Sequence, residues 1–402
     1  MRIIPGYSIF LWIAFVAAAC GDDSEPASGV AASVPASPTA VADISTFGDL
    51  DERLTPEQIE AGRMNMGWRQ YASPDSIIAN DTLSYPESWE DISASAVNGD
   101  AMFLPLHGDV AGPSVLRVQV LLDRAYFSPG IIDGRWGMNT EKAIYWLQER
   151  EGLAATGRVD EATFARLVEL AGGPQQIVTT HTLSAEDVSG PFVTIPEDIY
   201  EKAEMECMCY ESLSEKLSEM FHITPATLGM LNPDVDLNQL QAGDVLNVPN
   251  VTTRGPAPQQ AIAQIVISDG GHYIHALDAS GRTLYHFPTT LGSDYAPSPT
   301  GKFTITNIAH DPTWHYQPEL LTGVPDEKED AIIPPGPNNA VGVVWMQLSK
   351  PHYGIHGTSA PETIGYTTSH GCVRLTNWDA RFLAEQVDPG VAVHYRDITS
   401  DA

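Results

Sequence analysis

Two short segments near the C-terminus carry side chains that together could perform covalent chemistry. One ends in Ile355-His356-Gly357-Thr358, and the other, beginning thirteen residues after His356, reads Ser369-His370-Gly371-Cys372-Val373-Arg374-Leu375. A cysteine thiolate is a strong nucleophile, and a neighbouring imidazole lowers the thiol pKa from its usual value of about 8.5. The two segments therefore predict Cys372 as a nucleophile, with His356 and His370 as candidate bases.

The residues around Cys372 suit the other steps of such a reaction. Gly371 allows a backbone turn that directs N–H groups at a developing oxyanion. Arg374 is placed to bind a carboxylate or to brace the loop. Zinc needs three or four ligands at a recognisable spacing, and His356, His370 and Cys372 come with no carboxylate in pattern. We therefore expect neither a metal nor another cofactor.

Short strands are expected to hold these segments. Strand-like runs lie around Val266, Tyr273-Ile274, Leu284-Tyr285, Phe303 to Ile305, Val341 to Leu348 and Val391 to Tyr395. Turns that contain glycine or proline separate these runs. Many short strands of this kind predict an all-β sandwich over residues 262–397.

A helical unit is expected upstream, over residues 106–170. Apolar residues at helical spacing and glycine-rich turns predict three short helices there, with Thr140 and Asp160 as N-caps of the second and third. Residues 171–204 read as a connector. The chain is therefore multidomain, with an α+β fold class.

A second small unit is expected over residues 205–250. A capping box at Ser212 and the pair Thr224-Pro225 each open a helix, and Val245–Pro249 alternates as a strand. Residues 251–261 then form a linker to the predicted sandwich.

Cys207 and Cys209, at the start of this unit, allow two interpretations. In a strand, residues i and i+2 lie about 6.6 Å apart at Cα, near the upper limit for a disulfide. We therefore favour two buried or half-buried thiols, with a C-x-C disulfide as the alternative. No histidine or further cysteine lies beside them in the sequence, which disfavours a metal site.

The N-terminus has the layout of an export signal. The apolar run Ile9–Ala19 is too short to cross a membrane as a helix. Three alanines before Cys20 resemble a bacterial lipoprotein processing site, which implies lipidation of Cys20; an ordinary signal peptide is the alternative. Signal peptide, flexible tether and unassigned segment then cover 1–19, 20–43 and 44–105.

Composition excludes several classes of protein. The chain has 402 residues, 43% hydrophobic and 18% charged, which fits neither a disordered chain nor a multi-span membrane protein. Lys and Arg number 21 against 52 Asp and Glu, giving a net charge of −31. A field of this sign repels phosphates, so we expect no nucleic-acid partner and no electrostatic docking on anionic lipid.

Residues 262–397 resemble the L,D-transpeptidase (YkuD) family. The matching strings are Thr300–Phe303, Pro335–Asn339, Gly342–Trp345, Ile355–Thr358, Ile364-Gly365 and Ser369–Leu375. The resemblance implies a β-sandwich with the cysteine in a channel, Cys372 as nucleophile and His356 as proton donor and acceptor. It also implies a supporting or oxyanion loop made of Gly357, Ser369, His370, Gly371 and Arg374. Either a backbone carbonyl or a side chain could orient His356.

Both upstream units resemble wall-binding modules. Asp133–Gly137, Thr140, Leu147-Gln148 and Gly152–Gly157 resemble the three-helix peptidoglycan-binding module, and the unit over 205–250 resembles a βααβ LysM module with a degraded first strand. These resemblances imply peptidoglycan glycan and stem peptides as partners. Joined by linkers, two weak binding units would raise the local concentration of stems near Cys372.

Together the resemblances imply a lipid-anchored enzyme of the cell envelope, on its periplasmic or extracytoplasmic side. It would form 3→3 cross-links in peptidoglycan, or attach a lipoprotein acceptor to murein, through a thioester on Cys372. Two alternatives stay open. One is a hydrolase on the same scaffold, an L,D-carboxypeptidase or endopeptidase, and the other is a catalytically silent wall-binding lipoprotein.

Overall fold

The computed structural model describes residues 85–268, 270–293, 296–320 and 329–396. The predicted export signal, the lipidation at Cys20, the tether and most of the unassigned segment lie outside these residues. In the part that is described, no helix has both the length and the apolar character needed to span a bilayer.

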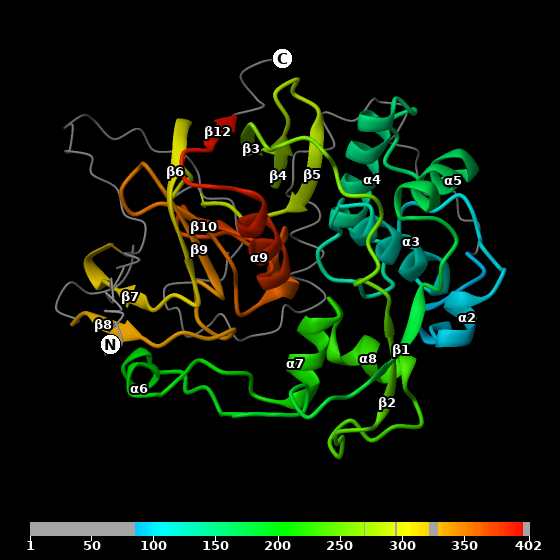
Figure 1. The fold of residues 1–402 in the computed structure, drawn as a ribbon, viewed down its shortest axis with the longest axis horizontal. Helices are drawn as coiled ribbons and strands as arrows, with labels where there is room; N and C mark the ends of the chain where they lie inside the picture. Colours follow the sequence, from blue (N-terminus) through cyan, green and yellow to red (C-terminus); the bar gives the residue numbers. More distant parts are fainter. Residues whose placement is uncertain (1–84, 269, 294–295, 321–328, 397–402) are drawn as a thin grey trace, which may run out of the picture.

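The C-terminal part is built on a mixed β-sheet. Among the described residues, eight strands form this sheet in the order β11-β10-β9-β6-β12-β3-β4-β5 (Figure 1). Their bounds are β3 (Gln264–Ser268), β4 (Tyr273–Leu277), β5 (Thr283–Pro288), β6 (Gly301–His310), β9 (Val344–Leu348), β10 (Gly354–His356), β11 (Val373–Arg374) and β12 (Ala392–Arg396). The strand-like runs read from the sequence are confirmed.

The predicted sandwich is wrong in one respect, because the strands form one curled sheet and not two separate ones. β6 is ten residues long; its first half pairs with β12 and its second half with β9. A register irregularity between Ile305 and Asn307 separates the two halves, and such bulges bend a strand. Beyond β5, bridges from Thr290 to Arg374 and from Gly292 to Ser369 bring the chain back to the β11 edge.

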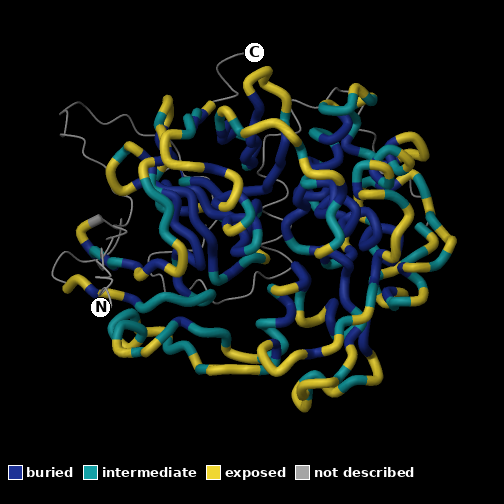
Figure 2. Tube along the Cα trace, viewed as in Figure 1, coloured by how far each residue is buried: buried dark blue, intermediate teal, exposed yellow. Residues whose placement is uncertain are grey.

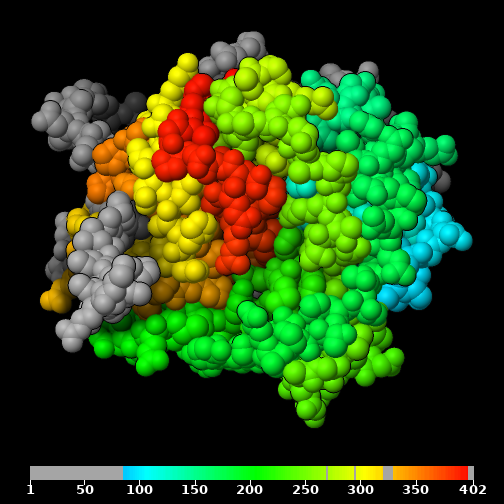
Figure 3. Space-filling model, viewed as in Figure 1, coloured from blue at the N-terminus to red at the C-terminus, as the bar shows by residue number. Residues whose placement is uncertain are grey.

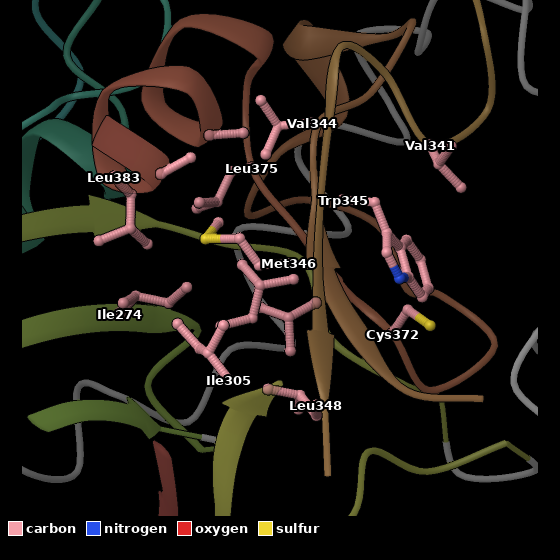
Figure 4. Packing of buried hydrophobic residues seen from close by; sticks show 14 of the residues in the cluster. Ile274, Ile305, Val341, Val344, Trp345, Met346, Leu348, Cys372, Leu375 and Leu383 are labelled. Carbon is pink, nitrogen blue, oxygen red and sulfur yellow. The ribbon is translucent and has the colours of Figure 1, made fainter. Parts of the chain in front are cut away.

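The curled sheet and a helix enclose one apolar core. Helix α9 (Asn377–Gln386) begins after Thr376, whose hydroxyl accepts the Asp379 N–H at 3.2 Å. Figure 4 shows Leu383 of this helix facing Met346 of β9 across the core. The two short strands β7 (Trp314–Tyr316) and β8 (Ala331–Ile333) pair with each other beside the sheet.

The three predicted helices are confirmed as α3 (Pro113–Arg124), α4 (Met138–Glu151) and α5 (Glu161–Leu170). Asp160 caps α5 as expected, because its carboxylate accepts the Thr163 N–H at 2.8 Å. The predicted cap at Thr140 is wrong. α4 begins two residues earlier, and the buried Thr140 hydroxyl instead accepts a hydrogen bond from the Gln119 amide at 3.2 Å.

The segment predicted as a connector contains structure of its own. Strand β1 (Val178–Thr182) pairs antiparallel with β2 (Val245–Pro249), and α6 (Ile199–Ala203) follows it. Helices α7 (Leu213–Met220) and α8 (Pro225–Leu231) lie between the two strands in sequence. The boundary at residue 205 was therefore placed too late, because the first strand of this βααβ unit lies within 171–204. Its likeness to LysM stays a prediction.

The two upstream units share one core. A single cluster of buried apolar side chains runs from Ile92 to Val251 and includes residues of α3, α7 and β2. The described part of 44–105 belongs to it: η4 (Trp89–Asp91) and α2 (Ala94–Asn98) pack there, and the Trp89 indole donates to the Asp133 carbonyl at 2.8 Å. Figure 2 shows buried segments in both the helical unit and the sheet.

The upstream units also pack directly against the C-terminal sheet. The Phe127 ring is fully buried and stacks on His286 of β5 with centroids 5.8 Å apart. The predicted linker over 251–261 has no helix or strand, but its middle is packed against the helical unit. The Gly255 N–H donates to the Arg124 carbonyl at 2.9 Å, and a Cβ on Gly255 would lie 1.9 Å from the Leu170 carbonyl oxygen. Figure 3 shows the helical units and the strands in contact over the face drawn.

Cys207 and Cys209 form a disulfide, so the favoured prediction of two thiols is wrong. Residues 206–210 are not in a strand, and the two Cα atoms are 5.2 Å apart. This separation falls inside the range that a disulfide spans, whereas the extended spacing assumed from the sequence lay near its limit.

Candidate active site

The strand register places the predicted catalytic side chains on one face of the sheet. Trp345 of β9, His356 of β10 and Arg374 of β11 stand opposite one another on three neighbouring strands. Cys372 lies in the bend just before β11, two residues from Arg374. Figure 4 shows Trp345 and Cys372 on the side of β9 away from Met346.

A backbone carbonyl orients the His356 ring. Its Nδ1 lies 2.6 Å from the carbonyl oxygen of Gly357. Because a carbonyl only accepts, Nδ1 must carry the hydrogen, and the lone pair is then on Nε2. The Trp345 ring stacks on the imidazole with centroids 5.4 Å apart. Of the two options left open by the sequence, the carbonyl is the one observed.

The His356 ring is held neutral. Burial, followed by the nearby positive charge of Arg374, lowers its pKa to about 3, although the hydrogen bond to Gly357 opposes this. Burial and Arg374 likewise lower the pKa of His370. Near neutral pH, His356 can therefore accept a proton at Nε2 but does not hold one in the resting state.

Cys372 lies at the buried edge of this site. It is 9% exposed, and its Sγ is 3.7 Å from the carbonyl oxygen of His352. In this structure Cys372 is disulfide-bonded. Nucleophilic chemistry needs the thiol, so the reaction considered below is that of the reduced enzyme.

Ser369 and Gly371 hold the turn that presents Cys372. The Ser369 hydroxyl donates to the Cys372 carbonyl at 2.6 Å and accepts the Gly371 N–H at 3.1 Å. Gly371 has φ of +104°, a conformation that side-chain-bearing residues rarely adopt. The Gly371 N–H thus braces the turn in this structure and does not point toward an oxyanion.

Sequence reasoning missed a second layer behind this turn. The Ser298 hydroxyl donates to the Gly371 carbonyl and accepts the Gly292 N–H, both at 2.9 Å. The Thr289 hydroxyl donates to the Arg374 carbonyl at 2.6 Å. These residues lie some 70 to 85 positions upstream of their partners, so no local pattern could have indicated them.

Sequence reasoning also missed Asn377, which fixes the backbone that orients His356. Its Oδ1 accepts the N–H groups of Thr358 at 3.1 Å and of Val343 at 3.3 Å. A Cβ on Gly357 would come within 2.3 Å of this oxygen, and one on Gly342 within 2.1 Å. Both glycines are therefore required for the amide to enter between the two loops.

The other end of the Asn377 amide is held by an upstream unit. Its Nδ2 donates to the Glu219 carboxyl of α7 at 3.0 and 3.3 Å, and the Tyr210 hydroxyl donates to the same carboxyl at 3.1 Å. Burial raises the Glu219 pKa to about 7, although these hydrogen bonds oppose the shift. A chain of contacts thus joins α7 to the loop that carries Gly357.

The structure brings together the predicted site residues that it describes. Around His356 and Cys372 lie Gly357, Ser369, His370, Gly371 and Arg374. The predicted lipidation site Cys20 lies outside the described residues. Within the described ranges, no group of three or more His, Cys, Asp or Glu side chains is arranged to hold a metal ion.

Two family descriptions match this chain. Residues 262–394 match "L,D-transpeptidase catalytic domain", a range that includes His356, Cys372 and Asn377 but not Glu219 or Tyr210. Residues 111–167 match "Putative peptidoglycan binding domain", which covers α3, α4 and most of α5.

The chain is also similar to individual proteins. "Putative L,D-transpeptidase YkuD" of Bacillus subtilis (strain 168) is 31% identical over 173 residues, which cover 43% of this chain and 87% of the relative. "Probable L,D-transpeptidase YbiS" of Escherichia coli (strain K12) is 30% identical over 179 residues, 41% of this chain and 54% of the relative. A crystal structure of the L,D-transpeptidase from Xylanimonas cellulosilytica DSM 15894 has 17% identity, covers 74% of this chain and 100% of its own, and has a TM-score of 0.32. On the family match and the Bacillus relative, the chain belongs to the L,D-transpeptidase (YkuD) family.

Proposed function

We propose that this protein is a peptidoglycan L,D-transpeptidase that works through a thioester on Cys372. The observation that carries the proposal is the state of His356, which stands opposite Arg374, two residues after Cys372. Its Nδ1 hydrogen is fixed on Gly357, and burial keeps the ring neutral, so that Nε2 is available as a base. Membership of the family supplies the reaction class.

The first half-reaction forms the acyl-enzyme. Nε2 of His356 takes the proton of the Cys372 thiol as Sγ attacks the carbonyl carbon of the third, L-linked residue of a stem peptide. The bond from this carbon to the nitrogen of the terminal D-alanine then breaks. His356 gives the proton to the departing amine, and the thioester is left on Cys372.

The second half-reaction transfers the acyl group. An acceptor amine attacks the thioester carbon, His356 takes a proton from that amine, and the C–S bond breaks to return the thiol. An amine on a neighbouring stem gives a 3→3 cross-link, and an amine on a lipoprotein gives a protein attached to murein. Water as acceptor would give the hydrolase, which is the competing function.

The supporting residues act on the geometry of these steps. Ser369 and Gly371 set the turn before the nucleophile. We assign backbone N–H groups of this turn to the oxyanion once substrate binds, and such a donor is worth about 2.7–4 kcal/mol in other acyl transferases. Arg374 and His370 lie beside the base, where Arg374 also disfavours a protonated His356.

Mass spectrometry of the intact reduced protein tests the nucleophile. Imipenem should add its own mass to the wild type, and Cys372→Ala should gain no adduct. His356→Gln should be acylated far more slowly, since the base is lost. A reduced wild type that gains no adduct would instead support a silent wall-binding protein.

Product analysis tests the acceptor. Purified muropeptides incubated with the wild type should yield cross-linked dimers, and Cys372→Ala should yield none. A stem shortened by one alanine, with no dimer, would show that hydrolysis is the reaction.

We further propose that the enzyme acts outside the cytoplasm and is lipid-anchored at Cys20. Peptidoglycan is an extracytoplasmic substrate, which supports the first part, and the processing-site resemblance supports the second. Metabolic labelling with a fatty acid in a bacterial host should mark the wild type and leave Cys20→Ala unlabelled. Equal labelling of both would overturn the anchor.

A further inference from the structure

A pocket lies where helix α4 crosses the outer face of the sheet. Its volume is about 560 Å³, and both matched domains line it. Trp146 and Arg150 come from α4, whereas the sheet and its turns supply Tyr273, His275, Arg282 and Arg396. The family match to the helical unit does not assign this pocket, and the catalytic mechanism does not use it.

Positive charge gathers in this pocket although the chain carries a net charge of −31. The Arg150 side chain is only 7% exposed; its Nε donates to Glu151 at 2.6 Å, and its guanidinium lies 4.4 Å above the Phe127 ring. Among the residues that the structure describes, no acceptor is recorded for its Nη1 or Nη2. A largely buried guanidinium therefore keeps donors for a ligand.

The charge balance fits a single carboxylate. Arg150, Arg282 and Arg396 face Glu149 on the pocket wall and Glu151 behind it, and Arg282 reaches Glu151 at 3.2 Å. Arg166 also bonds Glu151 at 2.6 Å and pairs with Glu169 at 2.6 Å, so four guanidinium groups against three carboxylates leave one net positive charge. A monoanion would neutralise it, whereas a phosphate dianion would leave an excess negative charge.

An aromatic wall stands beside the guanidinium groups. The Trp146 ring is partly exposed and contacts Tyr273 at 5.0 Å and His275 at 4.8 Å between centroids. Flat aromatic faces of this kind bind the apolar faces of sugars and peptides. The ligand thus needs an apolar or saccharide body and one exposed carboxylate.

We propose that this pocket binds a carboxylate-bearing muropeptide, with its carboxylate at Arg150, Arg282 and Arg396 and its body on Trp146. The identity of the ligand rests on the proposed function, because only a peptidoglycan enzyme has this compound as a neighbour. The pocket spans the seam between two domains, so an occupied pocket holds the sheet and the helical unit on the same wall fragment.

Calorimetric titration of the full chain tests the site. The background is Cys372→Ala, which prevents turnover, and the probe is a disaccharide tetrapeptide. Arg282→Gln with Arg396→Gln should raise the dissociation constant about tenfold, since each arginine loses a charge-assisted hydrogen bond. Both side chains are exposed, Arg282 by 58%, so the fold should survive.

The controls separate charge, site and function. Lys302→Gln removes an exposed cation that does not line the pocket and should leave affinity unchanged. A second probe is the same muropeptide with every carboxyl group amidated. Its dissociation constant for the Cys372→Ala protein should be about as high as that of the free acid for the double arginine variant. The proposal would be overturned if the double arginine variant bound the free acid as tightly as the Cys372→Ala protein does. It would also be overturned if the Cys372→Ala protein bound the acid and the amidated probe equally tightly.

Failure of the pocket and failure of the enzyme give different results. A protein that imipenem acylates at Cys372, but whose muropeptide affinity in the Cys372→Ala background does not depend on the arginines, has the proposed function without this site. A protein that imipenem does not acylate, but whose affinity depends on the arginines, has the site without the chemistry.

Discussion

At the residue scale, the amide of Asn377 acts on His356 through the backbone that orients the ring. Its oxygen accepts the Thr358 N–H, and the preceding residue, Gly357, accepts the hydrogen bond from His356 Nδ1 with its carbonyl oxygen. Asn377→Ala should slow imipenem acylation by about 10²-fold, because a small misplacement of the base has costs of that order. Stopped-flow acylation of the reduced enzyme measures the rate.

Asn338 provides the matched control for this prediction. It also joins the two halves of the molecule, because its amide donates to the Cys209 carbonyl at 3.0 Å and to Glu215 at 2.9 Å. Among the described residues, neither of these hydrogen bonds reaches the His356 loop. Asn338→Ala should lower the melting temperature and keep the acylation rate. Equal rate losses in both variants would mean that Asn377 acts only through stability.

The neutral state of His356 has a signature in the pH profile. With a pKa lowered to about 3, the base stays unprotonated down to pH 5, so acylation should not lose rate through this ring between pH 7 and 5.5. A histidine of ordinary pKa near 6.5 would be about nine-tenths protonated at pH 5.5, a loss of about tenfold. Acylation rates measured across this range test the prediction, with Trp345→Phe as a packing control. A fall in rate with a midpoint near pH 6.5 would contradict it.

The two segments that carry Cys372 and His356 could be predicted from the sequence because each is contiguous. Ser369, Gly371 and Cys372 interact within four residues, so their order alone indicates a turn. Asn377 and Glu219 could not be predicted as part of the site. They lie 158 positions apart, and only the folded chain brings an amide of one unit onto a carboxyl of another.

At the element scale, helices α7 and α9 meet through a donor–acceptor pair that can be exchanged. Asn377 donates to Glu219 with one end and accepts from Thr358 with the other. Asn377→Asp should slow acylation strongly, because two buried carboxyls would then face each other. Adding Glu219→Gln should restore a donor opposite the new carboxyl and recover much of the rate.

The single Glu219→Gln variant is the control for this pair. A glutamine still accepts from Asn377, so its rate should stay near wild type. The exchange idea is wrong if the double variant is no faster than Asn377→Asp alone. Circular dichroism melts of the variants would show whether folding, and not positioning, accounts for the differences.

Elements with strong local signals were predicted well, and elements that depend on a distant partner were not. The strands of the sheet and the helices α3, α4 and α5 follow apolar periodicity. β1 reads Val-Thr-Thr-His-Thr, whose β-branched residues favour a strand. It carries a single apolar residue, so the alternation that indicates a half-buried strand is missing, and pairing with β2 identifies it. The Cys207–Cys209 disulfide was the less favoured of two interpretations, because an extended backbone was assumed where the two Cα atoms are only 5.2 Å apart.

At the scale of the whole molecule, a buried polar junction joins three parts of the chain. Asp123 of α3 bonds His222 at 2.8 Å, and Asp379 of α9 accepts from the Ser128 hydroxyl at 2.8 Å. Burial would raise the Asp123 pKa, but the charge and hydrogen bond of His222, with Arg254, outweigh this and lower it. Burial raises the pKa of Asp379 to about 6.

Buried charges of this kind need fixed partners, which is evidence against independently tumbling modules. The sequence predicted units joined by linkers. The contacts between the helical unit, α7 and the sheet show that these units are packed together and do not move independently. In the sequence, Asp123 and Phe127 cannot be told apart from other residues of the helical unit. Only the folded structure shows that they contact His222 and His286 of other units.

Phe127→Ala tests whether the molecule unfolds as one unit. The ring is fully buried on His286, and losing it should cost about 3–5 kcal/mol. In a single cooperative unit, scanning calorimetry should show one transition shifted to lower temperature, and imipenem acylation should fail at that same lower temperature. Phe103→Ala, at a side chain 39% exposed, should leave both unchanged. Phe127→Ala could instead give two transitions, with acylation lost only at the unshifted one. The catalytic sheet would then be stable without the helical unit, and the contact between Phe127 and His286 would not couple their unfolding.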